Sequence, residues 1–455
     1  MKLIQILIIL FLSSSVTQAQ RSKKSKSSTP PAIDLKVAVD KMADEIEPQI
    51  IEARHWLHQH AELSNREFKT SEYIAQYLKS LGIEYQSGIA KTGVVGLIKG
   101  AKPGPTILLR ADIDGLPVTE RVDLPWKSTN KDVYNGIPVG VMHACGHDTH
   151  ISMLLGTAKI LNSMKDQIKG NIKLVFQPAE EGAPNGEEGG AALMIKEGVM
   201  SNPAVDVAFG LHINSLTPVG HINYKSGGTM AASDVINIKI KGKQVHGSTP
   251  WNGIDPVVVG AEIIMGLQTI ISRQTELTKE AAVLTIATFH SGVRNNIIPE
   301  DAELTGTLRT LDKDMQKIIH EKIKLTASKI AESMGAEAEI NIGTGYPVTY
   351  NNPELTQQML PTVQRVAGEK NVHNIKAMTG AEDFSFFAEK VPALFLFVGG
   401  MPAGNDPKMA PSHHTPDFYV EDSGMKTGIR TLCNLALDYA DNWKGTGLMS
   451  PAPVK

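Results

Sequence analysis

Short apolar runs that end in polar residues alternate with helical patterns along much of the chain. The apolar runs, with the residues that end them, predict four strands, at 106–112, 171–181, 205–212 and 393–398. Helical spacing of apolar residues predicts three helices, over 37–63, 71–81 and 151–164, with Gly82 as a stop signal for the second. Strands that alternate with helices favour a largely parallel sheet with helices on both faces. We therefore predict an α/β catalytic domain over 36–230 and 345–445.

The pattern changes between 231 and 344. Residues 235–241 alternate strictly between apolar and polar, and a helical pattern over 256–273 opens with Asp255 as the expected N-cap. The rest of the segment predicts two strands, a helix and a last strand, at 281–289, 302–309, 312–334 and 336–342. The order β-α-β-β-α-β is that of the split βαβ, ferredoxin-like arrangement. We predict that 231–344 is an α+β lid domain inserted into the catalytic domain.

The N-terminus is typical of an export signal. An apolar run over 3–12 follows Lys2, and small polar residues lead to Ala19. This pattern predicts a signal peptide over 1–19, and the run is too short to span a bilayer comfortably. Residues 20–35 are rich in Lys and Ser and predict a flexible leader, and 446–455 read as a tail. We expect a periplasmic or secreted protein that has no membrane contact once the signal is cleaved.

Composition narrows the class of protein. The chain has 455 residues, a formal net charge of −3 and 42% hydrophobic residues, which suits a globular protein of two domains. Because there is no basic excess, we expect no nucleic-acid partner.

A cluster of potential metal ligands lies between 143 and 150. Cys145 and His147 stand two residues apart, and a thiolate with an imidazole suits a borderline-soft metal such as zinc. The alternatives are a buried structural cysteine, satisfied turn histidines, or a disulfide to Cys433. Cys433 lies in an apolar-periodic stretch that is typical of core packing. We therefore expect no disulfide, and a Cys145 thiolate held by a cation.

Further polar residues follow the predicted strands. Asp112, Glu180, Glu181 and His212 all fall at strand ends, where ligands bind in open α/β sheets. Adjacent side chains of an extended segment point in opposite directions, so one glutamate can coordinate metal while the other acts as general base. Glu187 and Glu188 read instead as a solvated acidic loop, because exposed charge is the default. After the last strand, one of His413 and His414 is a candidate ligand, and Pro416 would stiffen the turn that aims His414.

The candidate ligands exceed the four of a closed structural zinc site. They are Cys145, His147, Glu181, His212 and His414. Such a set suits two nearby divalent ions with open positions, which can acidify a bound water and polarise a carbonyl. Glu180 would take the proton of the water and pass it to the leaving nitrogen. Zinc or manganese fits best, and nickel or cobalt also suits these ligand types.

The lid segment carries two polar turns. His246 follows an amphipathic strand, and Asn296 lies in a second turn. Ordinary turn chemistry explains both. Beside a metal centre, His246 could donate to a tetrahedral oxyanion and Asn296 could hold a substrate carboxylate.

Seven motifs in order carry a resemblance to a known family: 143–150, 177–182, 210–212, 246–250, 296–299, 380–384 and 413–416. Over 37–440 the chain resembles the metal-dependent amidohydrolases of the hippurate hydrolase and indole-3-acetyl-amino acid hydrolase type, within the aminoacylase and zinc carboxypeptidase superfamily. The turn 246–248 differs in having Gly247 and Ser248 where alanines are common in relatives. That difference leaves substrate preference open.

The resemblance implies a two-metal domain with an inserted lid, which hydrolyses the amide of N-acyl amino acids or related conjugates. It implies that the five candidates above are the metal ligands, that Glu180 is the general base, and that His246 and Asn296 meet the substrate. The resemblance also implies that Glu382 and Asp383 lie near the site. One interpretation is that they support the metal ligands. We expect His143, Asp148 and His150 to orient the ligands.

Two alternatives remain beside this function. One is a metallo-dipeptidase or carboxypeptidase. The other is a non-catalytic protein that binds a conjugate or a metal, which predicts degraded ligands or a missing base, and this sequence has neither. A homodimer formed through the lid domain is a further hypothesis.

Overall fold

The computed structural model describes residues 34–445. The predicted signal peptide, nearly all of the predicted leader and the predicted tail at 446–455 lie outside the described residues. Leu35, the last residue of the predicted leader, already belongs to the first helix.

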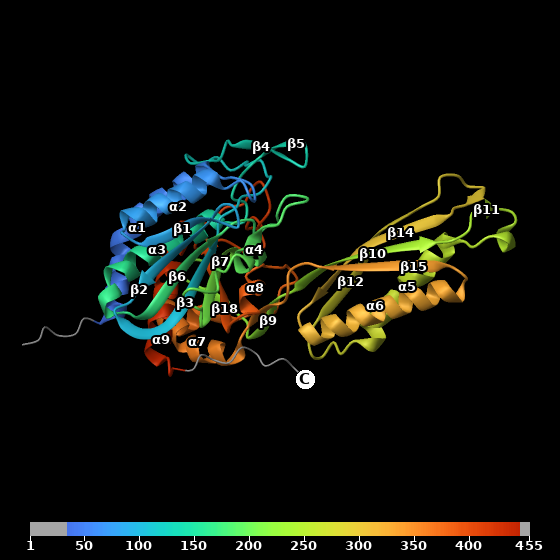
Figure 1. The fold of residues 1–455 in the computed structure, drawn as a ribbon. Helices are drawn as coiled ribbons and strands as arrows, with labels where there is room; N and C mark the ends of the chain where they lie inside the picture. Colours follow the sequence, from blue (N-terminus) through green and yellow to red (C-terminus); the bar gives the residue numbers. More distant parts are fainter. Residues whose placement is uncertain (1–33, 446–455) are drawn as a thin grey trace, which may run out of the picture. The chain divides into compact units, whose positions relative to one another are not determined.

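The main sheet has eight strands in the order β1-β2-β6-β3-β7-β18-β8-β17 (Figure 1). Their bounds are β1 Glu84–Ile89, β2 Gly93–Lys99, β3 Lys102–Asp112, β6 Lys169–Gln177, β7 Val207–Pro218, β8 Ile222–Tyr224, β17 Val372–Asn374 and β18 Ala393–Met401. The four predicted strands are the central β6, β3, β7 and β18, and they pair in parallel. The predicted, largely parallel sheet is confirmed. The antiparallel pairs β1·β2, β2·β6 and β18·β8 were not predicted.

Both faces of the central strands are buried, which explains their continuous apolar runs. On β3, Ile107 and Leu109 belong to one hydrophobic cluster and Leu108 to another on the opposite face. The first cluster packs under α1 Leu35–Gln59, α2 Phe68–Ser80, α3 His147–Ser163, α7 Pro353–Ala367 and α9 Gly424–Asn442. The second packs under α4 Gly190–Lys196 and α8 Ser385–Ala388. Helices therefore cover both faces, as predicted.

Helix α3 begins four residues earlier than the predicted start at 151. It starts at His147, directly after Gly146, whose φ of 93° lies in the left-handed region that glycine adopts without strain. The 143–150 cluster is therefore partly a helix terminus rather than a loop. His147 and His150, three residues apart, lie on the same side of the first turn.

Residues 232–344 form a second sheet with its own core. The strands are β10 Ala232–Lys241, β12 Ala282–Ser291, β14 Asp301–Thr310 and β15 Glu337–Thr344, all antiparallel, in the order β12-β14-β10-β15. Helices α5 Pro256–Gln274 and α6 Lys313–Ser333 lie along one face of this sheet (Figure 1). The predicted ferredoxin-like arrangement is confirmed, and Asp255 caps α5 by accepting from the Val257 N–H at 2.9 Å. The domain limits themselves stay a prediction.

Helix α5 is long and apolar enough to cross a membrane by length and composition alone. Its buried residues, among them Val259, Ile263 and Leu267, pack in the core of the lid sheet. This packing is that of a core helix in a folded domain.

The remaining strands form short ribbons. They are β4 Lys131–Tyr134 with β5 Ile137–Gly140, β9 Gly227–Met230 with β16 Thr349–Asn351, and β11 Val245–His246 with β13 Ile297–Ile298. Single 3-10 turns lie at Lys165–Gln167, Pro250–Asn252 and Glu369–Asn371.

Candidate metal centre

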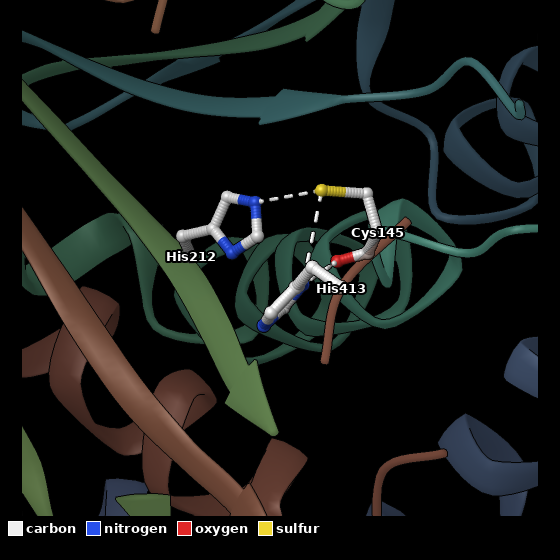
Figure 2. A group of neighbouring side chains, drawn as sticks. All are labelled: Cys145, His212 and His413. Atoms are coloured by element: carbon white, nitrogen blue, oxygen red, sulfur yellow. Dashed lines mark hydrogen bonds between the residues drawn. The ribbon is translucent and has the colours of Figure 1, made fainter. Parts of the chain in front are cut away.

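The thiol of Cys145 lies at the centre of a histidine cluster. Its Sγ is 3.3 Å from His212 Nε2, 3.3 Å from His414 Nε2 and 3.8 Å from His413 Nδ1. Figure 2 shows His212, on strand β7, and His413, from the loop after β18, both turned toward the sulfur. Cys145 itself directly precedes the glycine that opens α3. Three segments far apart in the sequence therefore meet at one sulfur atom.

Two glutamates complete the cluster. Glu181 Oε1 lies 3.0 Å from His414 Nε2 and 3.8 Å from His147 Nε2, while Glu180 Oε2 is also 3.8 Å from His147 Nε2. The five predicted ligands and the predicted base thus form one connected group. The distances between these side chains are compatible with two divalent ions that share the donors.

One buried nitrogen shows that the site is built to hold a cation. His147 Nδ1 donates to the Asp114 carbonyl oxygen at 2.8 Å, so the lone pair of Nε2 faces the cluster, where it has no hydrogen-bond partner among the described residues. An unsatisfied buried nitrogen costs about 1–3 kcal/mol. A metal ion removes that cost, and the mixed sulfur, nitrogen and oxygen donors are those that divalent transition metals accept.

The charges around Cys145 also call for a cation. Burial, then Glu181 and Glu180, raise the pKa of the Cys145 thiol well above its usual value. A thiolate forms there only when a positive ion compensates the carboxylates. Burial and the neighbouring His150 lower the pKa of His212, which leaves its ring neutral. The His212 ring is fixed by a 2.5 Å contact from Nδ1 to the Ile213 carbonyl oxygen, so Nε2 points at the sulfur.

His413 and His414 differ in what their ring nitrogens contact. Nδ1 of His413 lies 3.2 Å from the Cys145 carbonyl oxygen, and Nε2 accepts from the Ser215 N–H at 3.2 Å. Both nitrogens of His413 therefore have backbone partners. His414, with φ of 63°, instead presents Nε2 to Cys145 and Glu181. These contacts favour His414 as the ligand, although His413 also groups with Cys145 and His212.

Two aspartates at the end of strand β3 and just after it contact the candidate ligands and their neighbours. Asp114 Oδ2 accepts from the Glu181 N–H at 3.1 Å and from the Ser64 hydroxyl at 2.7 Å. Asp112 Oδ1 lies 2.5 Å from His150 Nδ1, and His150 Nε2 accepts from the Ile213 N–H at 2.8 Å. The orienting role predicted for His150 therefore acts through the backbone beside His212. We did not predict Asp114, although its position just beyond the end of β3 was a usable signal.

The orienting roles predicted for Asp148 and His143 need correction. Asp148 Oδ2 accepts from Arg54 Nε at 2.8 Å and from His58 Nδ1 at 2.9 Å, so it ties α3 to α1 instead of holding a ligand. His143 is buried, and neither of its ring nitrogens has a hydrogen-bond partner among the described residues. Burial lowers the pKa of His143 to about 4, which keeps the ring neutral.

A buried arginine network lies behind the base and was not predicted. Arg110, with a side chain that is 0% exposed, donates to Asp112 at 2.6 Å and to Glu382 and Asp383 at 2.8 Å each. Carboxylate oxygens of Glu180, Glu382 and Asp383 lie within 4.8 Å of one another. Burial and the nearby Glu382 raise the pKa of Glu180. Glu382 and Asp383 therefore lie beside the predicted base, and through Arg110 they are also joined to Asp112.

The two predicted substrate residues meet each other on the β11·β13 ribbon. The Gly247 N–H donates to the Asn296 carbonyl oxygen at 2.9 Å, next to His246. Both side chains are exposed, and His246 Nδ1 lies 2.8 Å from the Ser248 hydroxyl. Their contacts among the described residues are within the lid, so their roles toward substrate stay predictions.

Comparison with known proteins places this site in a family. The model for peptidase family M20/M25/M40 matches residues 108–438. The chain is 40% identical to thermostable carboxypeptidase 2 of Saccharolobus solfataricus, over 87% of this chain and 97% of that protein. It is 35% identical to the N-acetylcysteine deacetylase of Bacillus subtilis, over 87% of this chain and 98% of that protein.

The chain belongs to the peptidase family M20/M25/M40. Its fold also matches the crystal structure of the Bacillus subtilis protein YXEP, described as a dinuclear metal-binding peptidase of the M20 family, with a TM-score of 0.73 and 32% identity. That match covers 88% of this chain and 99% of the other. This family member is a metal-dependent amidohydrolase, and its cluster of thiol, imidazole and carboxylate donors suits two divalent ions.

Proposed function

We propose that this enzyme hydrolyses the amide bond of N-acyl amino acids or related amino acid conjugates. The observation that carries the proposal is the position of Glu180, a buried carboxylate beside the five-ligand cluster, with its Oε2 3.8 Å from His147 Nε2. The name of the deacetylase relative supports an N-acyl substrate. The intact base and ligands speak against the non-catalytic alternative.

Each residue of the site has a different part in the proposed hydrolysis. Bound metal ions supply Lewis acidity, which acidifies a water molecule and polarises the scissile carbonyl. Glu180 accepts the proton of the attacking water and delivers it to the leaving nitrogen, and its raised pKa suits both transfers. Arg110 holds the carboxylates of Glu382 and Asp383 behind Glu180. His246 donates to the developing oxyanion and Asn296 holds the substrate carboxylate, as the lid motifs predict.

Zinc or manganese is the proposed metal. Cys145 and the imidazoles of His147 and His212 favour zinc, while the carboxylate of Glu181 also accepts manganese. Nickel and cobalt share these ligand preferences. Metal analysis of the purified protein distinguishes them.

We also propose that the protein is exported and acts in the periplasm or outside the cell. The proposal rests on the apolar run at 3–12 and the small residues before Ala19. After cleavage we propose no membrane contact, and a homodimer through the lid domain. Cell fractionation, N-terminal sequencing and light scattering test these points.

A carboxypeptidase or dipeptidase activity is the second candidate, because a relative that is 40% identical is named a carboxypeptidase. The deciding experiment compares N-acetyl and N-benzoyl amino acids with dipeptides and N-blocked peptides, before and after chelation. We expect N-acyl amino acids to have the highest kcat/KM and chelation to abolish it. Preference for dipeptides with free amino termini would overturn the N-acyl proposal, and activity that survives full metal removal would overturn the metal-dependent one.

A further inference from the structure

A cavity of about 210 Å³ opens beside the metal ligand Glu181. Four segments form it: the stretch after α1, the turn after β3, the β4·β5 hairpin and the loop that follows Glu181. Its lining residues are Leu63, Ser64, Arg66, Gly115, Leu116, Pro117, Asp132, Val133, Tyr134, Asn135, Glu181, Gly182 and Pro184. The cavity is thus continuous with the catalytic edge of the sheet, and the motifs that form the metal cluster do not include the β4·β5 hairpin.

The cavity offers no free positive charge. Its one basic lining residue is Arg66, whose guanidinium contacts Glu187 Oε1 at 2.5 Å, Glu187 Oε2 at 3.2 Å and the Asn65 carbonyl oxygen at 3.0 Å. Asp132 adds negative charge to the lining, and the carboxylate of Glu181 is a proposed metal ligand. A substrate carboxylate would meet repulsion there, with no cation to pair with.

The remaining lining is uncharged, and much of it is apolar. Leu63, Leu116 and Pro117 form one side, while Val133 and Tyr134 of the hairpin form the other. The side chains of Val133 and Tyr134 are 59% and 38% exposed, so this wall of the cavity has apolar surface that is open to solvent. Burying it against an apolar group is favourable by roughly 25 cal/mol per Å².

The size of the cavity also limits its occupant. Pockets that enclose whole drug-sized ligands measure about 300–1,000 Å³. A cavity of about 210 Å³ suits one small group of a substrate rather than a complete conjugate.

We propose that this cavity binds the uncharged acyl group of the substrate, either a short aliphatic chain or a single aromatic ring, and that the β4·β5 hairpin sets acyl specificity. The proposal rests on the amide hydrolysis proposed above and adds to it a direction for the substrate. With the acyl group beside Glu181, the scissile carbonyl lies at the metal cluster. The amino acid and its carboxylate then extend away from the cavity.

Filling the cavity from its hairpin wall tests the proposal. Val133→Trp adds an indole at a lining position, and Ile137→Trp makes the same change on the same hairpin at a residue that is 64% exposed and does not line the cavity. The kcat/KM values of N-acetyl, N-butanoyl and N-benzoyl derivatives of one amino acid are measured for both metal-loaded variants and the parent.

We expect Val133→Trp to lower the ratio of benzoyl to acetyl kcat/KM by at least about tenfold, since small misfits in an apolar pocket change rates by 10- to 200-fold. Ile137→Trp should keep the ratio of the parent. In a second series, with the acetyl group fixed and the amino acid varied, Val133→Trp should keep the order of the parent.

Each other outcome has a distinct meaning. An unchanged acyl ratio in Val133→Trp, or a change that appears only in the amino acid series, overturns the acyl assignment while leaving the proposed reaction intact. A parent enzyme that cleaves none of the N-acyl amino acids overturns the proposed function itself.

Discussion

The metal edge of the main sheet and the β11·β13 ribbon of the lid are built in opposite ways. At the metal edge, Cys145 and His147 are buried, and the rings of His147 and His212 each contact a backbone carbonyl oxygen. On the ribbon, His246 and Asn296 are exposed and are joined by a backbone contact through Gly247. Burial fixes the geometry of the candidate ligands Cys145 and His147, whereas the side chains of His246 and Asn296 are open to solvent.

This contrast separates two kinds of variant. Changes at the buried edge should remove metal or destabilise the fold, because unpaired buried charges are costly. Changes on the ribbon should alter catalysis and leave metal content and stability as they are.

The largest effect is expected from Cys145→Ala. Loss of the sulfur at the centre of the cluster should lower metal affinity by at least about 100-fold, because even the partners of ligands contribute 10- to 100-fold. Activity should fall with it. Metal content after dialysis, measured by mass spectrometry, checks the change. Cys433→Ala is the matched control, since Cys433 is free and buried in the core of α9. Equal metal loss in both variants would contradict a specific role for Cys145.

Arg110→Met tests the network behind the base. Removing the guanidinium leaves the carboxylates of Asp112, Glu382 and Asp383 buried without their cation, so the free energy of unfolding should fall by about 3–5 kcal/mol. Urea unfolding of the metal-loaded protein measures it. Arg121→Met, which breaks an exposed ion pair with Asp417, should leave stability unchanged. If Arg110→Met and Arg121→Met lose the same free energy of unfolding, the buried Arg110 network stabilises the fold no more than an exposed ion pair does.

The ribbon is tested by His246→Ala. Loss of one donor to the oxyanion should lower kcat by about 10²–10³-fold, with metal content and unfolding unchanged. The control is His290→Ala, at an exposed histidine on β12 of the lid. A normal kcat in His246→Ala would show that the lid histidine takes no part in the reaction.

His58→Gln should give the smallest effect. Burial lowers the pKa of His58, but Asp148 and Glu120 outweigh burial and raise the pKa above 6.5. A group with a raised folded pKa stabilises the protein below its unfolded pKa of about 6.5, and that contribution is lost as pH rises through the folded value. The variant should be less stable by about 1–3 kcal/mol at pH 6, and the difference should shrink at alkaline pH. Thermal unfolding against pH measures it, and a difference that grows with pH would contradict the account.

The central strands and the lid could be predicted because local patterns determine them. Residues 106–112 are buried on both faces, and the strict alternation of 235–241 reflects a strand with one buried face. The short edge strands β8 and β17 carry no such pattern, since three residues cannot show a period. The start of α3 depended on the left-handed conformation of Gly146, which the apolar pattern alone does not reveal.

The ligand types at the site were visible in the sequence, but their supporting contacts were not. Arg110 lies inside an apolar strand, and its partners Glu382 and Asp383 are more than 270 positions away. Only the folded sheet brings them together. Likewise, the sequence could not separate His413 from His414, because the difference lies in the backbone contacts of the His413 ring.

The central claim is that Glu180 is the base of a two-metal hydrolase, and Glu180→Gln tests it most directly. The amide keeps the size of the side chain and removes its ability to accept a proton. Metal content and kcat are measured on the same preparation. The account predicts two divalent ions per chain in both proteins and a kcat that is about 10²–10⁴-fold lower in the variant. A metal-loaded Glu180→Gln variant that turns over substrate as fast as the parent would contradict it.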